Sequence, residues 1–229
     1  MQNEEALASI PLFAQLTEEQ TALIAGRLRR RTYAEREVIV RRDDPGDALF
    51  IVTSGKVKIS YSDEENETII AMMSAGEFFG ELSILDGEAR SADVVALEPT
   101  DVLVLSADDF HQCLAVMPGI ATGLLRELAG RLRRSTSWIR ALSSQDVYGR
   151  IAQQLLFLAD THGIEGPDGS RRIPLRLTQN DLAGIIGASR ESVNKAVGYF
   201  KGKGYISVDN ATYHITVHDR PALEKRSRQ

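Results

Sequence analysis

Cysteine is scarce in this chain, and that scarcity excludes several kinds of protein. The single residue, Cys113, allows neither an intrachain disulfide framework nor an iron–sulfur or zinc site built from several cysteines. No apolar run approaches about 18 residues, the length expected of a transmembrane helix. The acidic N-terminus, residues 1–5, lacks the basic start and apolar stretch of a signal peptide. We therefore expect a cytoplasmic protein that does not engage a membrane.

Charge is unevenly distributed along the 229 residues, whose formal net charge is −5. Residues 1–145 carry 15 basic and 23 acidic side chains, a balance of −8. Residues 146–229 carry 12 basic and 9 acidic side chains, a balance of +3. Because neutralisation of phosphates dominates affinity for nucleic acid, this distribution favours a DNA-binding segment behind an acidic, sensor-like half.

The N-terminal half changes from a helical pattern to a strand pattern. Residues 4–31 are expected to form short helices, one of which begins with the capping-box pattern of Thr17 and Gln20. Between residues 33 and 105, short apolar runs such as 49–52, 57–61 and 102–105 are separated by turn residues. Many short strands at this spacing are typical of a β-sandwich or jelly roll.

After residue 118 the pattern is helical for more than 20 residues. Two rows of residues spaced by seven form a narrow seam: Leu125, Leu132 and Ile139, and Leu128, Ser135 and Leu142. A seam this narrow favours a two-stranded coiled coil, and hence a homodimer, over burial in a globular core. Ser135 is the polar member, and the simplest explanation for it is that it sets the register of the two helices.

The C-terminal part begins with an amphipathic helix predicted over residues 146–160. Residues 161–172 are rich in glycine, proline and charge, which predicts a loop, and residues 173–219 form a compact segment with helix and strand signals of its own. We therefore predict three parts: a β-barrel domain over 1–118, a dimerisation helix over 119–145 and a further domain over 146–229.

Two capped helices in succession are predicted on either side of Gly187. Thr178 and Ser189 are favourable N-caps, and each is followed by an apolar helical face: Leu182, Ile185 and Ile186, then Val193, Ala196, Val197 and Phe200. Gly187 accommodates the turn between them because glycine adopts positive φ without a steric penalty. Strand patterns over 205–208 and 213–217 then predict a wing. The sequence thus predicts a winged helix-turn-helix.

The polar face of the second helix suits double-stranded DNA. It carries Arg190, Glu191, Asn194 and Lys195, of which arginine donates twice to guanine and glutamate accepts from cytosine. Thr178, Gln179, Ser189 and Ser192 lie near the two helix N-termini, where phosphates bind. The alternative is an αα-hairpin with solvated charges, which the predicted wing and the basic balance disfavour.

These segments resemble a known family. LTQNDLA at 177–183 and GASRESVNK at 187–195 resemble the DNA-reading motif of the CRP/FNR regulators, and DVYGRIA at 146–152 resembles that family's hinge and next helix. The likeness covers nearly the whole chain. It implies an α+β protein with a jelly-roll cyclic-nucleotide-binding domain, a long dimerisation helix and a winged helix-turn-helix. It also implies RNA polymerase as a partner.

The resemblance assigns base reading to Arg190, Glu191 and Lys195. Arginine, glutamate and a basic residue at these positions are similar to the cyclic AMP receptor branch, which reads TGTGA half-sites in a palindrome. Lys195 stands where the best-known member of that branch has arginine, a departure that bears on the inner bases of the half-site.

The segment GEFFGELS at 76–83, followed by RSA at 90–92, has the chemistry that a small anionic nucleotide needs. Gly80 allows close backbone approach, Glu81 accepts from a sugar hydroxyl, and Arg90 with Ser91 donates to a phosphate. A strand turn with a surface Glu–Arg pair is the alternative. The segment resembles the phosphate-binding cassette of cyclic-nucleotide-binding domains, which favours a site at Gly80, Glu81, Leu82, Arg90 and Ser91. Its Glu81–Arg90 interval is one residue shorter than in the best-known cyclic AMP receptor, which predicts a trimmed hairpin at 85–88.

The same resemblance gives Ser135 a second role. Ser135 and Thr136 fall where cyclic AMP receptors place a Thr-Ser pair that binds adenine from both subunits, and Arg131, one turn earlier, would also face the ligand. Cyclic AMP is therefore the expected effector. Cyclic GMP, cyclic di-GMP or no ligand at all remain as alternatives.

Other members of the family and other functions fit less well. One cysteine is too few for an iron–sulfur sensor, and the four histidines lie outside residues 33–105, where a haem sensor would need an axial ligand. We expect neither group, and no metal. Cys113 is expected to be an apolar filler and not a redox switch. No spacing of a Ser/His/Asp triad, a metal site or a P-loop indicates an enzyme, although Glu77 and Glu81 allow acid/base chemistry to be considered.

Overall fold

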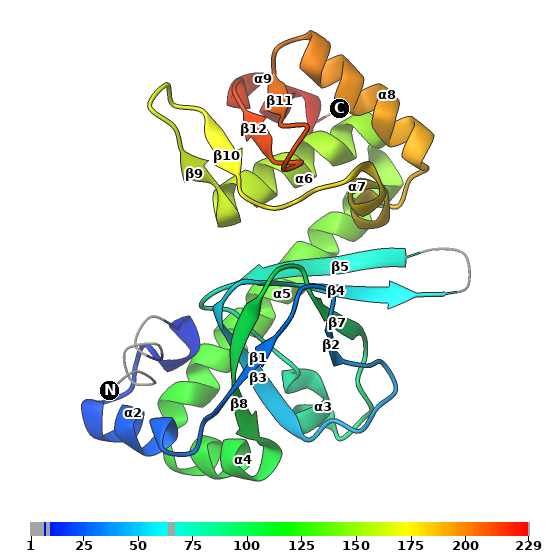
Figure 1. The fold of residues 1–229 in the computed structure, drawn as a ribbon. Helices are drawn as coiled ribbons and strands as arrows, with labels where there is room; N and C mark the ends of the chain where they lie inside the picture. Colours follow the sequence, from blue (N-terminus) through cyan, green and yellow to red (C-terminus); the bar gives the residue numbers. More distant parts are fainter. Residues whose placement is uncertain (1–6, 8–9, 64–66, 229) are drawn as a thin grey trace. The chain divides into compact units, whose positions relative to one another are not determined.

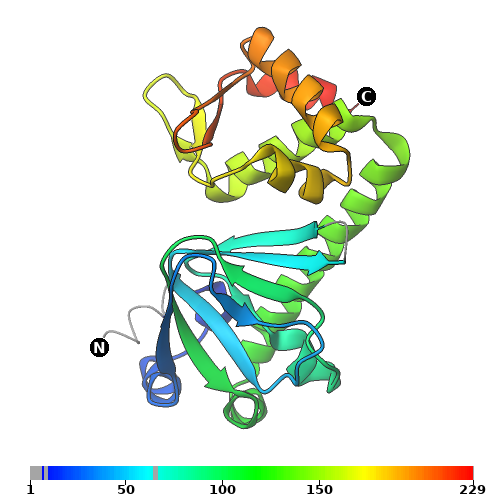
Figure 2. The same ribbon diagram turned by 45° about the vertical axis from the view of Figure 1, so that its right-hand side comes forward.

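The computed structural model describes residue 7, residues 10–63 and residues 67–228. These residues divide into two compact units, Met1–Arg133 and Arg134–Gln229, and the boundary falls inside one long helix. Figures 1 and 2 show the strands of the N-terminal unit in blue to green and the helices α6 to α9 of the C-terminal unit in yellow-green to red.

The N-terminal unit is built on two antiparallel four-stranded sheets. The first has the order β1-β8-β3-β6 and the second the order β2-β7-β4-β5. The strand bounds are β1 Arg29–Tyr33, β2 Val38–Val40, β3 Ala48–Ser54, β4 Lys56–Ser62, β5 Glu67–Ser74, β6 Phe78–Phe79, β7 Asp93–Ala96 and β8 Thr100–Ser106. This arrangement confirms the jelly-roll prediction.

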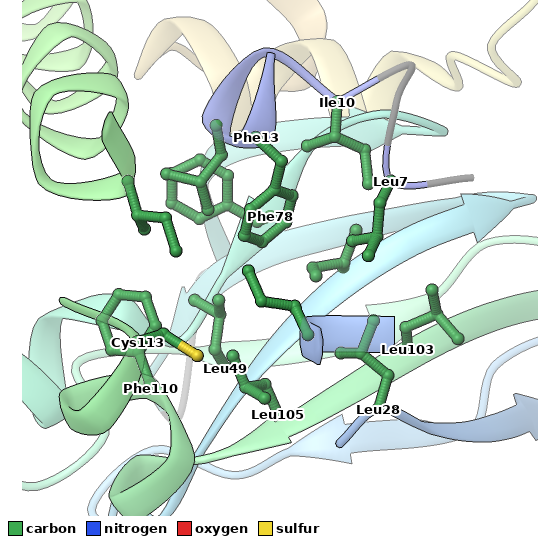
Figure 3. Close-up of a cluster of buried hydrophobic side chains, with 14 of the residues drawn as sticks. Leu7, Ile10, Phe13, Leu28, Leu49, Phe78, Leu103, Leu105, Phe110 and Cys113 are labelled. Atoms are coloured by element: carbon green, nitrogen blue, oxygen red, sulfur yellow. The ribbon is translucent and has the colours of Figure 1, made fainter. Parts of the chain in front are cut away.

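Strand β3 is buried on both faces, and this explains its apolar run. Successive side chains of a strand point to opposite sides. Phe50 and Val52 therefore enter a core shared with residues of the second sheet, such as Val57 and Val94. Leu49 and Ile51 enter another core, which helices cover (Figure 3).

The helices of the N-terminal unit lie over that second core. They are the short 3-10 helix η1 (Pro11–Phe13), α2 (Glu18–Ala25), α3 (Glu81–Asp86), α4 (Ala107–Val116) and the first part of α5 (Pro118–Ser144). Thr17 and Gln20 form the expected capping box at the start of α2. Cys113 is buried in this core, and burial raises the pKa of its thiol.

Two expectations for this unit are wrong, and one helix was not predicted. The helical pattern ends before Arg29, because residues 29–33 pair with β8 as an edge strand. The hairpin predicted at 85–88 is instead the end of helix α3, which stops at Gly87 with φ of 76°. Helix α4 was not foreseen at all. Pairing with distant strands and burial against the helix-covered core decide these elements, and a local pattern contains neither.

Helix α5 leaves most of the predicted seam uncovered. Leu125, Leu132 and Ile139 are each more than 60% exposed, and Leu142 is 44% exposed. Leu128 instead packs at the edge of the helix-covered core. Four large apolar side chains in a row on one helix are an unusual exposed surface for a protein in water. In the described residues no single helix is long and apolar enough to cross a membrane; only α4 and α5 together pass that test, and they are bent by 110°.

The C-terminal unit contains the predicted winged helix-turn-helix. Its elements are α6 (Val147–His162), β9 (Ile164–Glu165), β10 (Arg171–Ile173), α7 (Gln179–Ile186), α8 (Arg190–Gly202), β11 (Ile206–Val208), β12 (Ile215–Val217) and α9 (Arg220–Arg226). The sheet has the order β11-β12-β10-β9. The loop predicted over 161–172 is therefore wrong in part, since β9 and β10 form a hairpin whose second strand pairs with β12. Helix α9 is a further element that the sequence pattern did not indicate.

Replacement of Phe110 by alanine tests the helix-covered core. Phe110 is fully buried in it, so the Phe110→Ala variant should lose about 3–5 kcal/mol of unfolding free energy through lost contacts and a cavity. Urea denaturation followed by circular dichroism measures this change. Phe157 on α6, 38% exposed, is the matched control, and Phe157→Ala should cost under about 1 kcal/mol. Equal losses in the two variants would contradict the assigned core.

Candidate functional site

The segment between β6 and α3 brings Gly80 into contact with Arg90 and Glu81 into contact with Arg131. Gly80 has φ of 85° and immediately precedes α3, whose first residue is Glu81. A Cβ at Gly80 would lie 2.7 Å from Arg90 Nη1 and 3.0 Å from the carbonyl oxygen of Ala48. Glycine is therefore required here both by the backbone conformation and by the close approach of the Arg90 guanidinium.

Arg90 is a buried cation, with an exposed fraction of 5%. Nη1 donates to the carbonyl oxygen of Gly80 and Nη2 to that of Ala48, each at 2.9 Å. Its ion-pair partner among the described residues is Asp47, 3.6 Å away, with a side chain that is 91% exposed. Burial lowers the pKa of Arg90, because removal from water disfavours the charged form. Because the carboxylate that pairs with this buried guanidinium is itself exposed to water, the site favours binding of an additional anion.

Glu81 is joined to the long helix by a second arginine. Arg131 Nη1 on α5 donates to Glu81 Oε1 at 2.9 Å, and Nη2 donates to the carbonyl oxygen of Phe78 at 2.6 Å. Arg131 also pairs with Glu127, and its guanidinium lies 4.7 Å from the centre of the Phe78 ring. The family resemblance predicts that Arg131 faces a ligand. It did not predict the ion pair between Arg131 and Glu81, which lies 50 residues earlier.

The remaining predicted effector residues are exposed. Ser91 follows Arg90 directly, and Leu82 on α3 is 45% exposed. Ser135 and Thr136 have exposed side chains on α5, about one helical turn after Arg131. These positions make all four side chains accessible from water.

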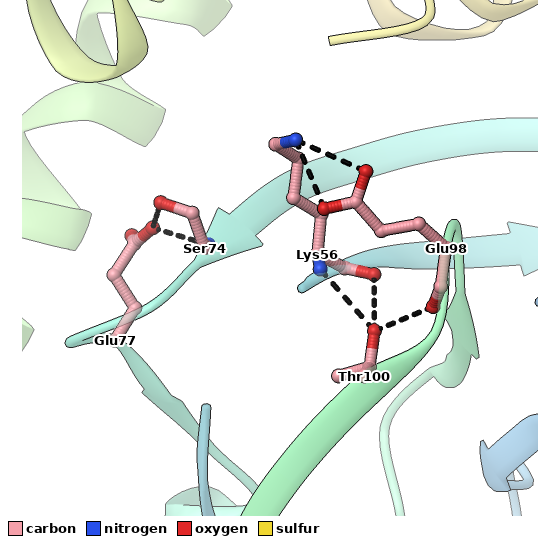
Figure 4. Close-up of polar contacts among 5 residues, drawn as sticks. All are labelled: Lys56, Ser74, Glu77, Glu98 and Thr100. Carbon is pink, nitrogen blue, oxygen red and sulfur yellow. Dashed lines mark hydrogen bonds and ion pairs between the residues drawn. The ribbon is translucent and has the colours of Figure 1, made fainter. Parts of the chain in front are cut away.

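Glu77, the other acidic residue of the segment, closes a turn. Its carboxylate accepts from the backbone N–H of Ser74 at 2.8 Å and from the Ser74 hydroxyl at 3.3 Å (Figure 4). Figure 4 also shows a separate turn, in which Thr100 Oγ1 donates to the carbonyl oxygen of Glu98 at 2.7 Å and accepts from the N–H of Lys56. Glu77 therefore has a local structural partner. In the part of the chain that is described, no three His, Cys, Asp or Glu side chains are placed to hold a metal ion.

The helix-turn-helix is fixed by its caps. Thr178 Oγ1 accepts from the N–H of Asp181 at 3.1 Å, and the Asp181 carboxylate accepts from the N–H of Thr178 at 2.9 Å. Gly187 ends α7 with φ of 61°, and Ser189 caps α8 by accepting from the N–H of Ser192 at 3.2 Å. The predicted apolar faces of both helices are buried. The helix-turn-helix prediction is confirmed.

The opposite face of α8 is open to solvent. Arg190, Glu191, Asn194 and Lys195 are all exposed, and Lys195 pairs with Glu191 at 2.9 Å. Thr178, Gln179 and Ser192 are half-buried, and Ser189 is exposed. The wing follows, and its tip is held by the Asp209 carboxylate, which accepts from the N–H groups of Thr212 and Ala211 at 2.8 Å. These hydrogen bonds lower the pKa of Asp209.

Arg150 is a structural residue that the sequence reasoning missed. Nε donates to the carbonyl oxygen of Ile186, at the end of α7, at 3.0 Å. Nη1 donates to the carbonyl oxygen of Gln145, just after α5, at 3.1 Å. One guanidinium thus binds the negative ends of two helices. Its partner in α7 lies 36 residues away, so no local pattern could have indicated the contact.

The fold and these two groups of residues define a class of protein: a ligand-sensing sheet domain joined by a long helix to a winged helix-turn-helix. Comparison with known families agrees with this class. The model of the cyclic nucleotide-binding domain matches residues 30–116, and that of the Crp-like helix-turn-helix domain matches residues 149–226.

Individual relatives span nearly the whole chain. The CRP-like cAMP-activated global transcriptional regulator of Mycobacterium tuberculosis is 33% identical over 226 residues, which cover 98% of this chain and 100% of the relative. The cyclic AMP receptor protein of Thermus thermophilus is 32% identical over 216 residues, 94% of this chain and 95% of the relative. The chain belongs to the CRP/FNR family of transcription regulators; it binds DNA through its helix-turn-helix and is not an enzyme.

A solved structure supports the fold. The c-di-GMP responsive global regulator CLP of Xanthomonas campestris matches with a TM-score of 0.74 and 22% sequence identity, over 88% of this chain and 99% of that one. At this identity the likeness concerns the fold.

The Thr178 cap gives a test of the helix-turn-helix. Loss of the Thr178 hydroxyl in Thr178→Ala should destabilise the C-terminal unit by about 1 kcal/mol, because the N–H of Asp181 loses its acceptor. Thermal unfolding followed by circular dichroism measures the loss. Thr178→Ser keeps the hydroxyl and should unfold like the parent protein; if serine were as damaging as alanine, the cap would not be the cause.

Proposed function

We propose that this regulator works as a homodimer gated by a cyclic nucleotide, with cyclic AMP as the preferred effector, and that it reads a palindromic TGTGA-like site. The observation that carries the effector proposal is the buried Arg90 guanidinium. Its partners are two carbonyl oxygens and an exposed carboxylate, so a cyclic phosphate would supply the missing buried counter-charge. Ser91 would add a hydroxyl and an N–H to the same phosphate.

Glu81 fits the ribose side of the same ligand. Its carboxylate has more than one acceptor position, so it can accept from a ribose hydroxyl while Arg131 remains bound. At Gly80 and Leu82 the ligand would lie close to the protein backbone. The purine would then be read by Ser135 and Thr136, whose exposed hydroxyls offer donors and acceptors that the apolar seam residues lack.

The homodimer proposal rests on the uncovered seam of α5. Leu125, Leu132, Ile139 and Leu142 are exposed along one face with a heptad spacing, and a second copy of the same helix would cover them. Ser135 lies in the same seam, and Leu128, which packs partly on the helix-covered core, borders it. Each buried apolar side chain of this size contributes about 1.5–3 kcal/mol when it leaves water, which favours pairing.

The gating mechanism that we propose is a population shift. Glu81 and Arg131 tie the ligand-binding segment to α5, so a ligand at Arg90 and Glu81 would favour one arrangement of that helix. In the active dimer, the two α8 helices would be about 34 Å apart, one turn of DNA. A differential affinity of a few kcal/mol would suffice to change occupancy greatly.

Base reading is assigned to α8. Arg190 would donate to guanine, Glu191 would accept from cytosine, and Lys195 would act at the inner bases, with Asn194 beside them. Thr178, Gln179, Ser189 and Ser192 would bind phosphates near the helix N-termini. RNA polymerase would be a further partner, and the protein would act in the cytoplasm.

The second candidate is a family regulator with a different effector, or with none. The relative from Xanthomonas campestris is named as c-di-GMP responsive, and Lys195 and the Ser135–Thr136 order depart from the cyclic AMP receptor pattern. Titration calorimetry with cyclic AMP, cyclic GMP and cyclic di-GMP separates these possibilities.

Arg90→Ala is the direct test of the effector site. Cyclic AMP should bind the parent protein, and the variant should bind at least about tenfold more weakly because a charge-assisted phosphate contact is lost. Weak nonspecific DNA binding should persist. Arg30 on β1, 46% exposed at its side chain, supplies the control Arg30→Ala, which should bind cyclic AMP normally. Unchanged binding in folded Arg90→Ala, checked by circular dichroism, would refute the assignment.

Leu132→Asp tests the dimer seam. A carboxylate on this 68% exposed residue would have to be buried in the helix pair, so the variant should be monomeric where the parent protein is dimeric. Sedimentation velocity measures the change. Ile70 on β5, 61% exposed and outside the seam, gives the control Ile70→Asp. A dimer that survives Leu132→Asp would exclude this helix face as the interface.

Arg190→Ala tests base reading. Binding to a TGTGA palindrome should weaken by about 1–3 kcal/mol, while binding to a scrambled duplex should hardly change. Fluorescence anisotropy at one fixed salt concentration gives both affinities. Lys225→Ala, an exposed charge removal on α9, should leave both values unaltered. Equal weakening on the two duplexes would make Arg190 a phosphate contact and not a base-reading residue.

A further inference from the structure

Helix α9 has no part in the effector site or in base reading, yet it is firmly anchored. Its Leu223 is fully buried, and the helix packs along α6. At its start, Arg220 donates to both carboxylate oxygens of Asp160 on α6, at 2.5 and 2.9 Å. The hydrogen bond from Arg220 lowers the pKa of Asp160. One end of α9 is therefore fixed to the far end of α6.

The other end of α9 reaches the junction between α5 and α6. Arg226 forms an ion pair with Asp146, the residue that caps α6 by accepting from the N–H of Gly149 at 2.9 Å. The Arg226 guanidinium also lies 5.4 Å from the centre of the Tyr148 ring. Although the Asp146 side chain is 57% exposed, that of Arg226 is only 19% exposed, so the arginine is held on two sides.

A second contact joins the same two places. Gln145, the first residue after α5, donates through Nε2 to the carbonyl oxygen of Ser227 at 2.6 Å. Its Oε1 is buried and has no hydrogen-bond partner among the described residues. The contact with Ser227 is therefore the one described hydrogen bond of this amide, and it fixes the residue that links the two helices.

The junction is in turn in contact with the recognition helix. The Tyr148 ring meets Tyr199 of α8 edge-on, with centroids 5.5 Å apart, and Phe200 at 6.1 Å. Arg226, Tyr148 and Tyr199 thus form a continuous row of contacts from the C-terminal helix to the helix that carries the base-reading face. Every member of this row lies in the C-terminal unit.

We propose that α9 is a clamp on the α5–α6 junction, and that Arg226 is a positioning residue for DNA recognition. By holding Asp146 and Tyr148, it makes the junction and α8 move as one body. Its effect on gating rests on the proposed function, because only a regulator with an effector has gating to lose. Its effect on the junction itself does not depend on any ligand.

Hydrogen exchange of the full-length protein without effector is the first test. In Arg226→Ala, the amides of Gly149 and Arg150 should exchange about five- to tenfold faster, because Asp146 is no longer held by Arg226; its carboxylate accepts from the first amide and its backbone carbonyl oxygen from the second. Arg228→Ala, an exposed arginine two residues later, is the matched control and should exchange like the parent protein. Unchanged exchange at the two amides in Arg226→Ala would overturn the clamp.

DNA affinity with and without cyclic AMP is the second test. The ratio of the two affinities should fall about fivefold in Arg226→Ala, and Arg226→Lys, which keeps the charge, should recover part of it. If both affinities fell together with the melting temperature and the ratio stayed constant, Arg226 would be merely structural and the positioning role would be wrong. If the parent protein itself showed no response to cyclic AMP, the proposed effector would fail, and the exchange measurement alone would decide the clamp.

Discussion

The ion pair between Glu81 and Arg131 is the interaction on which the N-terminal unit depends. The Glu81 side chain is 4% exposed, so removal of the Arg131 charge would leave a buried carboxylate without its ion-pair partner. The carbonyl oxygen of Phe78 and the carboxylate of Glu127 accept further hydrogen bonds from the same guanidinium. The pair therefore fastens the long helix to the sheet at the place where the effector segment begins.

Two arginines approach the same corner of the molecule. Glu81 is the buried carboxylate there, whereas Asp47 and Glu127, the other ion-pair partners of Arg90 and Arg131, are more exposed. In the proposed mechanism, an anionic nucleotide binds at this corner and acts on α5 through contacts that already exist. A site built in this way joins ligand binding to helix position without a separate relay, because the groups that hold the ligand also hold the helix.

In the C-terminal unit, too, arginine side chains make structural contacts, here at the ends of helices. Arg150 binds the carbonyl ends of α7 and of the segment after α5, and Arg226 binds the N-cap of α6. Both contacts meet at the junction where the two functional parts of the chain are joined. Charge-assisted contacts and an aromatic group therefore connect this junction to α7 and α8.

The local sequence was sufficient to predict those features that depend on neighbouring residues. The caps at Thr17, Thr178 and Ser189 and the turn at Gly187 were predictable, because each depends on residues within about one helical turn. Of the residues predicted to form the effector site, Arg90 and Gly80 are in direct contact. Tertiary structure decided the rest. Strands β1 and β10 exist because distant strands pair with them, and the Glu81–Arg131, Arg150–Ile186 and Arg226–Asp146 contacts join residues 36 to 80 positions apart. The local pattern of apolar and polar residues cannot predict such contacts, because burial and strand pairing are properties of the folded chain and not of any single segment.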